Sequence, residues 1–135
     1  MIVVRGGKTI SMGVYDLLVG DILLLEAGDI VPVDAILIEG QDVKCDESSA
    51  TGESDTLEKV PADIALQSTE RTKCDPFILS GTKVLEGVGR AVVTAVGTNS
   101  CYGRMMLCSY LIALVKLTRL SISRRPRGYT IANQT

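Results

Sequence analysis

The chain has 135 residues, of which 46% are hydrophobic and 22% charged, so it can bury the core of one domain and is too apolar for a disordered chain. It contains no histidine, which excludes Ser-His and Cys-His nucleophiles and leaves carboxylates, lysines or a partner for any catalysis. The net charge of −2 hides a break in the chain. Residues 1–104 hold all 16 acidic and 9 of the 14 basic residues, a net charge of −7, whereas residues 105–135 hold five basic and no acidic residues.

The first 104 residues have the pattern of a β domain with an aliphatic core. Residues 1–12 predict a hairpin that turns at Gly6-Gly7, because two glycines between apolar runs favour a tight turn. Apolar runs at Ile22–Leu25 and Val33–Ile38 predict two more strands, separated by Gly28-Asp29 and Pro32, and residues 42–47 alternate apolar and polar side chains.

The second half of this region continues the pattern after a polar interval. Residues 61–76 have no consistent period and predict a surface excursion, whereas residues 77–97 predict two or three strands separated by glycines. Many short strands without a βαβ rhythm indicate a small barrel, sandwich or jelly-roll-like domain.

The C-terminal part differs in kind. A helical pattern begins near Asn99, and an apolar run of 11 residues ends before Lys116, which is shorter than the ~20 residues of a bilayer-spanning helix. Residues 121–135 are basic and interrupted by Pro and Gly, so we expect disorder there. This tail either rests on an anionic membrane surface or lacks its native context.

The cysteines do not form a metal or redox motif. Cys45, Cys74, Cys101 and Cys108 contain no CxxC pair, and the first residues lack the pattern of a secretory leader. We therefore expect reduced, structural cysteines.

An acidic loop at residues 44–59, KCDESSATGESDTLEK, is the most unusual stretch, and three interpretations apply to it. The first is structural: Asp55 followed by Glu58 fits a helix N-cap with its reciprocal partner. The second is a calcium loop, because oxygen-bearing residues fall at positions 1, 3, 5, 9 and 12 with Gly52 at position 6. Those five are Glu47, Ser49, Thr51, Asp55 and Glu58.

The third interpretation is a carboxylate on an exposed tip. Gly52 permits backbone angles closed to other residues, and Glu53 beside it can orient or deprotonate a water. The chain has no GxxxxGK[ST] phosphate loop and no evident second acid, so Glu53 would have to act on another domain.

The sequence DESSATGES, at residues 46–54, resembles the signature of the actuator domain of P-type cation-transporting ATPases. Residues 14–40 and 75–106 are similar to the segments that precede and follow this signature in the family. The resemblance covers residues 2–106 and is closest to plasma-membrane and fungal vacuolar calcium pumps. It implies a distorted jelly roll, related to a double-stranded β-helix, with a helical tail.

The resemblance also implies residue roles. Glu53 would position the water that hydrolyses an aspartyl phosphate, Thr51 and Gly52 would shape the loop tip against the phosphate, and Ser54 would support it. Asp46, Glu47 and Asp55 would be loop scaffold, and Gly28-Asp29 and Asp34 would be structural. No cofactor is expected in this chain, whereas ATP and magnesium are implied for the complete pump.

The partners implied are the phosphorylation and nucleotide-binding domains and the membrane helices of a complete pump. No nucleic-acid partner is expected. The domain would lie on the cytosolic face of a vacuolar or plasma membrane, and the chain alone would be cytoplasmic. Ala27 and Ala35 stand where the family usually has Pro and Gly, which are mild departures.

Larger parts of the family pattern are missing. The chain lacks the phosphorylated Asp-Lys-Thr-Gly-Thr motif, and residues 107–135 do not resemble the family. We therefore expect a truncated fragment, inactive alone, with an actuator-type domain at residues 1–104 and an unrelated basic tail with an apolar helix at 105–135. The alternatives are a stand-alone regulatory or calcium-binding β module and a non-functional truncated product.

Overall fold

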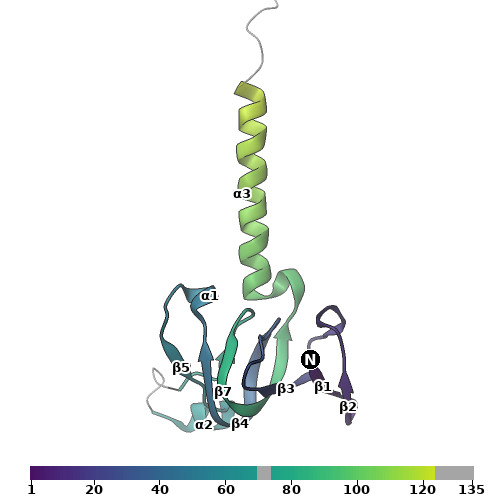
Figure 1. Cartoon of the computed structure of the whole chain (residues 1–135), viewed down its shortest axis with the longest axis vertical. Helices are drawn as coiled ribbons and strands as arrows, with labels where there is room; N and C mark the ends of the chain where they lie inside the picture. The colour runs from purple at the N-terminus through teal and green to yellow at the C-terminus, as the bar shows by residue number, and fades with distance from the viewer. Residues whose placement is uncertain (70–73, 124–135) are drawn as a thin grey trace, which may run out of the picture.

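The computed structural model describes residues 1–69 and 74–123, with the backbone alone at 119–123, and it is built around one antiparallel sheet (Figure 1). The strand order is β2-β1-β3-β7-β4-β5, and β6 pairs with β4 outside this path. The strands are β1 (Ile2–Arg5), β2 (Lys8–Ser11), β3 (Ile22–Glu26), β4 (Asp34–Asp46), β5 (Thr56–Glu58), β6 (Phe77–Ile78) and β7 (Lys83–Ala95). The expectation of a mainly β domain without parallel crossovers is confirmed.

The N-terminal hairpin forms as predicted. Strands β1 and β2 pair antiparallel from Ile2 opposite Ser11 to Arg5 opposite Lys8. Gly6 and Gly7 make the turn with φ of 57° and 75°, the left-handed angles that a two-residue hairpin turn requires. The predicted strand at Ile22–Leu25 is β3, which lies between β1 and β7.

Two 13-residue strands, β4 and β7, form the centre of the sheet. Residues 77–97 therefore contain two strands, with Gly87 and Gly89 inside β7 rather than between strands. The register between β4 and β7 shifts at several places, including between Gln41 and Lys44. Gly87 has φ of 87°, and a Cβ there would lie 2.4 Å from the carbonyl oxygen of Asp42, so the strands meet too closely for a side chain.

The core is aliphatic, as the scarcity of aromatic residues predicts. Alternate residues of β3, β4 and β7 point inward, which gives the period of two of a strand with one buried face. The fully buried large side chains include Leu23, Leu25, Leu37, Ile78, Val3, Val31, Val33, Val43, Val84 and Val93. The buried residues of β4 thus anchor the strand that leads into the acidic loop.

The predicted surface excursion contains a short helix. Pro61 precedes α2 (Ala62–Gln67), and none of its residues is buried. Six residues are too few to show a helical period, which explains why the sequence pattern predicts no helix there. Residues 70–73 lie outside the described part of the chain.

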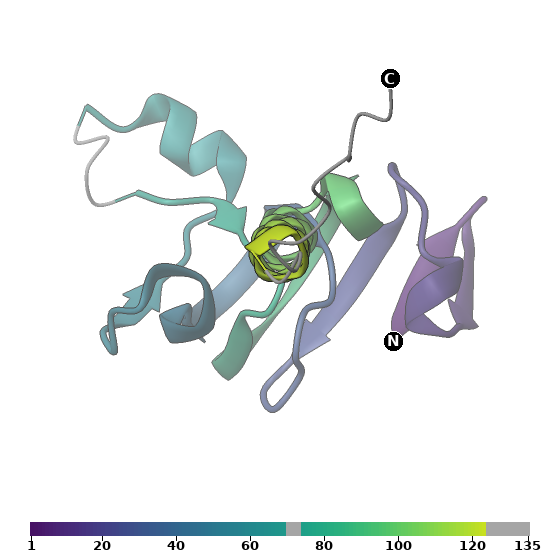
Figure 2. The same cartoon turned by 90° about the horizontal axis from the view of Figure 1, so that it is seen from above.

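The C-terminal helix α3 (Cys101–Ser123) begins directly after a short 3-10 turn, η2 (Gly97–Asn99). Another 3-10 turn, η1 (Val14–Asp16), lies between β2 and β3. Helix α3 stands on the sheet domain and points away from it, over the middle of the sheet (Figures 1 and 2). The predicted apolar run ends before Lys116, but the helix continues beyond it. Residues Cys101–Thr118 have a mean hydropathy of 1.2 and none is buried, so by length and composition this stretch could cross a membrane. The disorder expected at residues 121–135 is wrong for residues 121–123, whose backbone continues α3, and its remainder, 124–135, lies outside the described residues.

Candidate functional site

The acidic loop leaves the end of β4 and returns to the sheet through β5. Its first turn is a short helix, α1 (Ser48–Thr51), which ends at Gly52 with φ of 76°. The Gly52 N–H donates to the carbonyl oxygen of Ser48 at 2.9 Å, so this glycine closes the helix in the left-handed conformation. Gly52 therefore adopts a backbone conformation that other residues rarely adopt, as the sequence predicts.

The predicted helix cap at Asp55 and Glu58 is wrong. Residues Thr56–Glu58 form β5, which pairs with Lys44–Asp46 of β4. Pairing with a distant strand thus overrides the local capping signal, and the helix of this loop precedes Gly52 instead of following Asp55.

Glu53 lies at the exposed tip of the loop, next to Gly52. Thr51, Glu53, Ser54 and Asp55 are all exposed. The Thr51 hydroxyl donates to the carbonyl oxygen of Glu47 at 3.0 Å and accepts a hydrogen bond from the Glu53 N–H at 3.3 Å. Among the described residues, no hydrogen bond or ion pair involves the Glu53 carboxylate, so it is available to an outside group.

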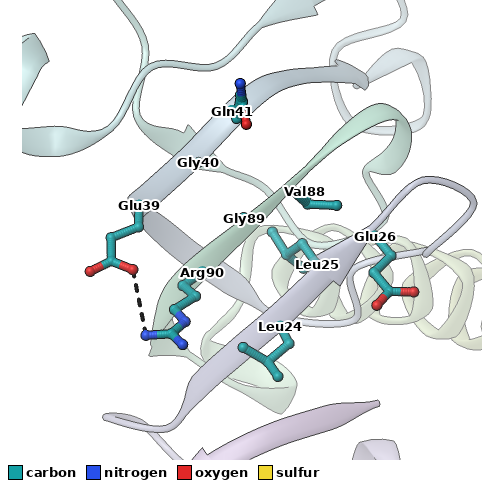
Figure 3. Close-up of a pocket in the computed structure, with 9 residues that line it drawn as sticks. All are labelled: Leu24, Leu25, Glu26, Glu39, Gly40, Gln41, Val88, Gly89 and Arg90. Atoms are coloured by element: carbon teal, nitrogen blue, oxygen red, sulfur yellow. Dashed lines mark ion pairs between the residues drawn. The ribbon is translucent and has the colours of Figure 1, made fainter.

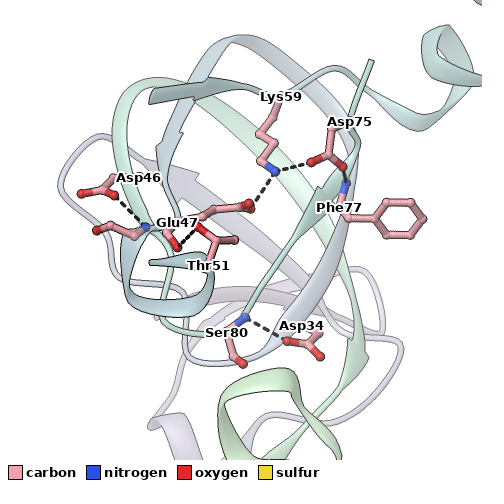
Figure 4. Close-up of polar contacts among 9 residues, drawn as sticks. Asp34, Asp46, Glu47, Thr51, Lys59, Asp75, Phe77 and Ser80 are labelled. Atoms are coloured by element: carbon pink, nitrogen blue, oxygen red, sulfur yellow. Dashed lines mark hydrogen bonds and ion pairs between the residues drawn. The ribbon is translucent and has the colours of Figure 1, made fainter. Parts of the chain in front are cut away.

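The base of the loop is held by buried charges (Figure 4). The Lys59 ammonium lies 2.6 Å from Glu47 Oε1 and 2.7 Å from Asp75 Oδ2. The Lys59 side chain is 0% exposed and that of Glu47 is 5% exposed. Asp46 accepts a hydrogen bond from the Ser48 N–H at 2.9 Å, and its bonds from Ser48 hold the pKa of this carboxyl below its usual range.

The calcium-loop alternative does not fit this geometry. The Glu47 carboxylate, its first ligand, faces Lys59 inside the loop base, and Glu58, its last, lies on β5. Among residues 1–69 and 74–123, no group of three or more Cys, Asp or Glu side chains is arranged to hold a metal ion. The carboxylates at positions 1, 9 and 12 of that pattern are therefore not brought together.

A junction joins this loop to α3. The Ser49 hydroxyl of α1 donates to the carbonyl oxygen of Gly81 at 2.8 Å. Next to Gly81, the Ser80 hydroxyl accepts a hydrogen bond from the Tyr102 N–H at 2.7 Å. The turn between β6 and β7 thus contacts both the loop and the first turn of α3.

Asp34 and Ser100 complete the attachment of α3. The Asp34 carboxylate accepts hydrogen bonds from the N–H groups of Ser80 and Cys101, both at 2.8 Å, and the Ser100 hydroxyl accepts one from Gly103 at 3.2 Å. The first N–H groups of a helix have no partner within it, so these side chains satisfy them. Asp34 has the structural role that the resemblance implies.

Two hollows lie away from the loop tip. One, of about 360 Å³, lies over Gly40 of β4 and Gly89 of β7, which have no side chains to fill it (Figure 3). It lies beside the ion pair between Arg90 and Glu39, whose atoms are 3.5 Å apart. The other, of about 880 Å³, lies at the foot of α3 and includes Tyr15 and Tyr102. Neither is lined by Glu53.

Comparison with known proteins decides the family. The family model described as the P-type ATPase actuator domain matches residues 1–108. The chain belongs to the P-type ATPase actuator-domain family. The match includes the whole acidic loop and the junction with α3, and the suspected resemblance is confirmed.

The similar curated proteins are full-length pumps. "Calcium-transporting ATPase 2" of Schizosaccharomyces pombe is 44% identical over 127 residues, which are 90% of this chain and 10% of that protein. "Plasma membrane calcium-transporting ATPase 1" of Gallus gallus is 52% identical over 101 residues, which are 75% of this chain and 8% of that protein. The actuator-domain chain therefore spans about a tenth of these relatives.

The actuator fold is also similar to solved structures. A zinc-transporting PIB-type ATPase in the E2.Pi state matches with a TM-score of 0.58 and 20% identity over 96% of this chain and 18% of the other. A second structure of a zinc-transporting PIB-type ATPase, in a different state, matches with a TM-score of 0.59 and 21% identity over the same shares of the two chains. At this identity the similarity concerns the fold alone.

Sequence reasoning identified the loop tip but missed two residues that hold the loop base, Lys59 and Asp75, and one that holds the start of α3, Ser80. Lys59, Asp75 and Ser80 carry no local signal, because a single lysine, aspartate or serine is common on any surface. Only the pairing of β5 with β4 and of β6 with β4 brings them to the loop and the junction.

Proposed function

We propose that this actuator domain serves a calcium-transporting P-type ATPase and that Glu53 positions the water that hydrolyses its aspartyl phosphate. The exposed Glu53 carboxylate beside the left-handed Gly52 carries this proposal. The similar curated proteins are calcium-transporting ATPases, which supports calcium as the transported ion.

The chemistry follows from the position of the carboxylate. Glu53 accepts a proton from a water molecule, whose oxygen attacks phosphorus in line with the bond to the aspartate oxygen. That bond breaks, inorganic phosphate leaves, and the aspartate carboxylate is regenerated. A phosphoenzyme is stable until the water is brought into line, so a carboxylate that arrives on a moving domain acts as a gate.

The other residues of the tip have supporting roles. The Thr51 hydroxyl donates a hydrogen bond to the carbonyl oxygen of Glu47 and accepts one from the Glu53 N–H, which supports a role in shaping the tip. Gly52 leaves space for a close approach to the phosphate, and no atom lies within 4 Å of where its Cβ would be. Ser54 is exposed beside Glu53 and would support the tip.

The remaining parts of the pump complete the proposal. The phosphorylation and nucleotide-binding domains would supply the aspartyl phosphate, with ATP and magnesium bound there, and α3 would transmit rotation of the domain to membrane helices. The domain would lie on the cytosolic face of the membrane. The division between an actuator domain at 1–104 and a basic tail at 105–135 remains a prediction, and α3 crosses that boundary without a break.

A chimeric pump tests the role of Glu53. Residues 2–106 replace the matching segment of the Schizosaccharomyces pombe relative, the pump is phosphorylated with labelled ATP, and decay of the phosphoenzyme is followed after a chase. Glu53→Ala is expected to slow the decay about 100-fold or more, because a positioned base contributes about that much.

Asp55→Ala is the matched control, because Asp55 is an exposed carboxylate two residues away on the same loop. It is expected to leave the decay rate within about twofold of the parent chimera, as expected for a surface change away from the reacting atoms. Decay of Glu53→Ala at the rate of the parent would overturn the proposal.

A further inference from the structure

We propose that Lys59 is a positioning residue that sets the place of Glu53 through the buried ion pair at the loop base. This inference rests on the proposed function, because it concerns the same loop. Lys59 is the last residue of the loop and Glu47 directly precedes its short helix, and their side chains meet inside it at 2.6 Å. The ion pair thus closes the loop at its base and leaves the tip exposed.

A chain of contacts leads from Lys59 to Glu53. The Lys59 N–H donates to the carbonyl oxygen of Val43 at 2.8 Å, which fixes its backbone to β4. Its ammonium holds the Glu47 side chain, and the Glu47 carbonyl oxygen accepts hydrogen bonds from the N–H and hydroxyl of Thr51. The Thr51 hydroxyl in turn accepts the Glu53 N–H.

The contacts of the ammonium set its direction. Lys59 Nζ makes an aligned hydrogen bond to Asp75 Oδ2, whose other oxygen accepts the N–H of Phe77 at 2.9 Å. Its contact with Glu47 Oε1 is an ion pair without hydrogen-bond alignment, and that oxygen has no hydrogen-bond partner among the described residues. The Glu47 carboxylate therefore depends on the charge of Lys59 to stay buried.

Stability alone does not require this arrangement. A buried ion pair replaced by apolar residues of similar volume is often as stable as before, because desolvation of the two charges offsets their attraction. What the charges add is one preferred geometry at the loop base. A displacement of about 1 Å at a reacting group can cost about 100-fold in rate, so this geometry matters for Glu53.

The test separates positioning from folding with two variants of the chimeric pump. Lys59→Met leaves Glu47 buried without a counter-charge, whereas Glu47→Leu combined with Lys59→Met removes both charges of the buried pair. Asp75, whose side chain is 45% exposed, remains in both variants and can still accept the Phe77 N–H. We expect the double variant to be phosphorylated by ATP at the parent rate and its phosphoenzyme to decay at least tenfold more slowly. The phosphoenzyme of the Lys59→Arg variant is expected to decay at no less than half the parent rate, because arginine keeps the positive charge.

Lys44→Met is the matched control, because Lys44 lies at the other end of the loop and its ion pair with Glu86, at 2.6 Å, has both side chains exposed and includes neither Glu47 nor Lys59. The phosphoenzyme of this variant is expected to decay at the parent rate. Hydrogen exchange on the 135-residue chain supplies a second measurement: the Thr51 and Gly52 N–H groups should exchange at least tenfold faster in the double variant.

The outcomes distinguish this inference from the proposed function. If Glu53→Ala slows decay and the folded double variant decays at the parent rate, the positioning role of Lys59 is overturned while the function stands. If Glu53→Ala itself has no effect, the proposed function fails first. Unchanged exchange at Thr51 and Gly52 in the double variant also counts against the inference.

Discussion

The carboxylate of Asp34 lies 2.8 Å from the backbone nitrogen of Cys101, although 67 residues separate them. Asp34 begins β4 and Cys101 begins α3, so this contact attaches the C-terminal helix to the centre of the sheet. Its other oxygen accepts the N–H of Ser80, in the turn that also contacts the acidic loop through Gly81. Asp34 therefore links the start of α3 to the turn that contacts the acidic loop.

Asp34→Ala is expected to loosen α3 from the sheet. The substitution leaves the N–H groups of Ser80 and Cys101 without their partner, at a cost of about 1–3 kcal/mol. Limited proteolysis should cut the variant faster than the parent chain between η2 and α3, and the N–H groups of Cys101 and Tyr102 should exchange faster.

Asp29→Ala is the control for that experiment. Asp29 accepts the backbone N–H of Glu26 at 3.0 Å, so it too caps a turn, but this turn follows β3, and among the described residues Asp29 makes no hydrogen bond to α3. Its substitution should leave the cleavage pattern at α3 unchanged. Equal cleavage in both variants would show that Asp34 has no special part in the attachment.

Acid should weaken the sheet domain partly through Asp21. Arg5 hydrogen-bonds this buried carboxylate, which holds the pKa of Asp21 below its usual value of 3.8. Because the folded pKa is lower than the unfolded one, the stabilisation is present above about pH 4 and is lost as pH falls through the folded value.

Urea titrations at pH 7 and pH 2 measure this loss. The free energy of unfolding should fall less between these pH values in Asp21→Asn than in the parent chain, because the variant has no proton to take up at this position. The Asp55→Asn variant, which replaces an exposed carboxylate, should lose as much free energy of unfolding between these pH values as the parent chain. A parent-sized loss in Asp21→Asn would contradict the linkage.

Cys45 is expected to resist alkylation in the folded chain. Burial raises the pKa of its thiol to about 11, and the thiolate is the reactive form. Cys108 is exposed on α3 and serves as the internal control. Peptide mass spectrometry after iodoacetamide at pH 8 should find Cys108 modified first and Cys45 modified only in guanidinium chloride. Equal rates in the folded chain would show that Cys45 is accessible.

Gly87→Ala is expected to destabilise the centre of the sheet. The φ of 87° is strained for alanine, and the added Cβ would meet the carbonyl of Asp42, so we expect a loss of about 2–4 kcal/mol in the free energy of unfolding. Gly6→Ala has a similar positive φ but open space, and should lose only about 1–2 kcal/mol. Thermal unfolding of both variants checks the difference, and equal losses would show that the close approach has no cost.

Local patterns in the sequence predicted those features whose causes are local. The hairpin at Gly6-Gly7 follows from two residues that adopt positive φ, and the strands follow from alternating aliphatic residues. The left-handed turn at Gly52 and the exposure of Glu53 have the same kind of cause. The charge break at residue 105 has no counterpart in the backbone, because α3 begins at Cys101.

The sequence by itself determined the β class, the hairpin and the candidate loop, since each depends on neighbours in the chain. Only the tertiary structure decided that Thr56–Glu58 is a strand, because its partner strand lies ten or more residues away. It also decided that Lys59 meets Glu47 and that Asp34 meets Cys101. A buried charge or a helix terminus needs a partner, but which residue supplies it depends on how distant strands bring the side chains together.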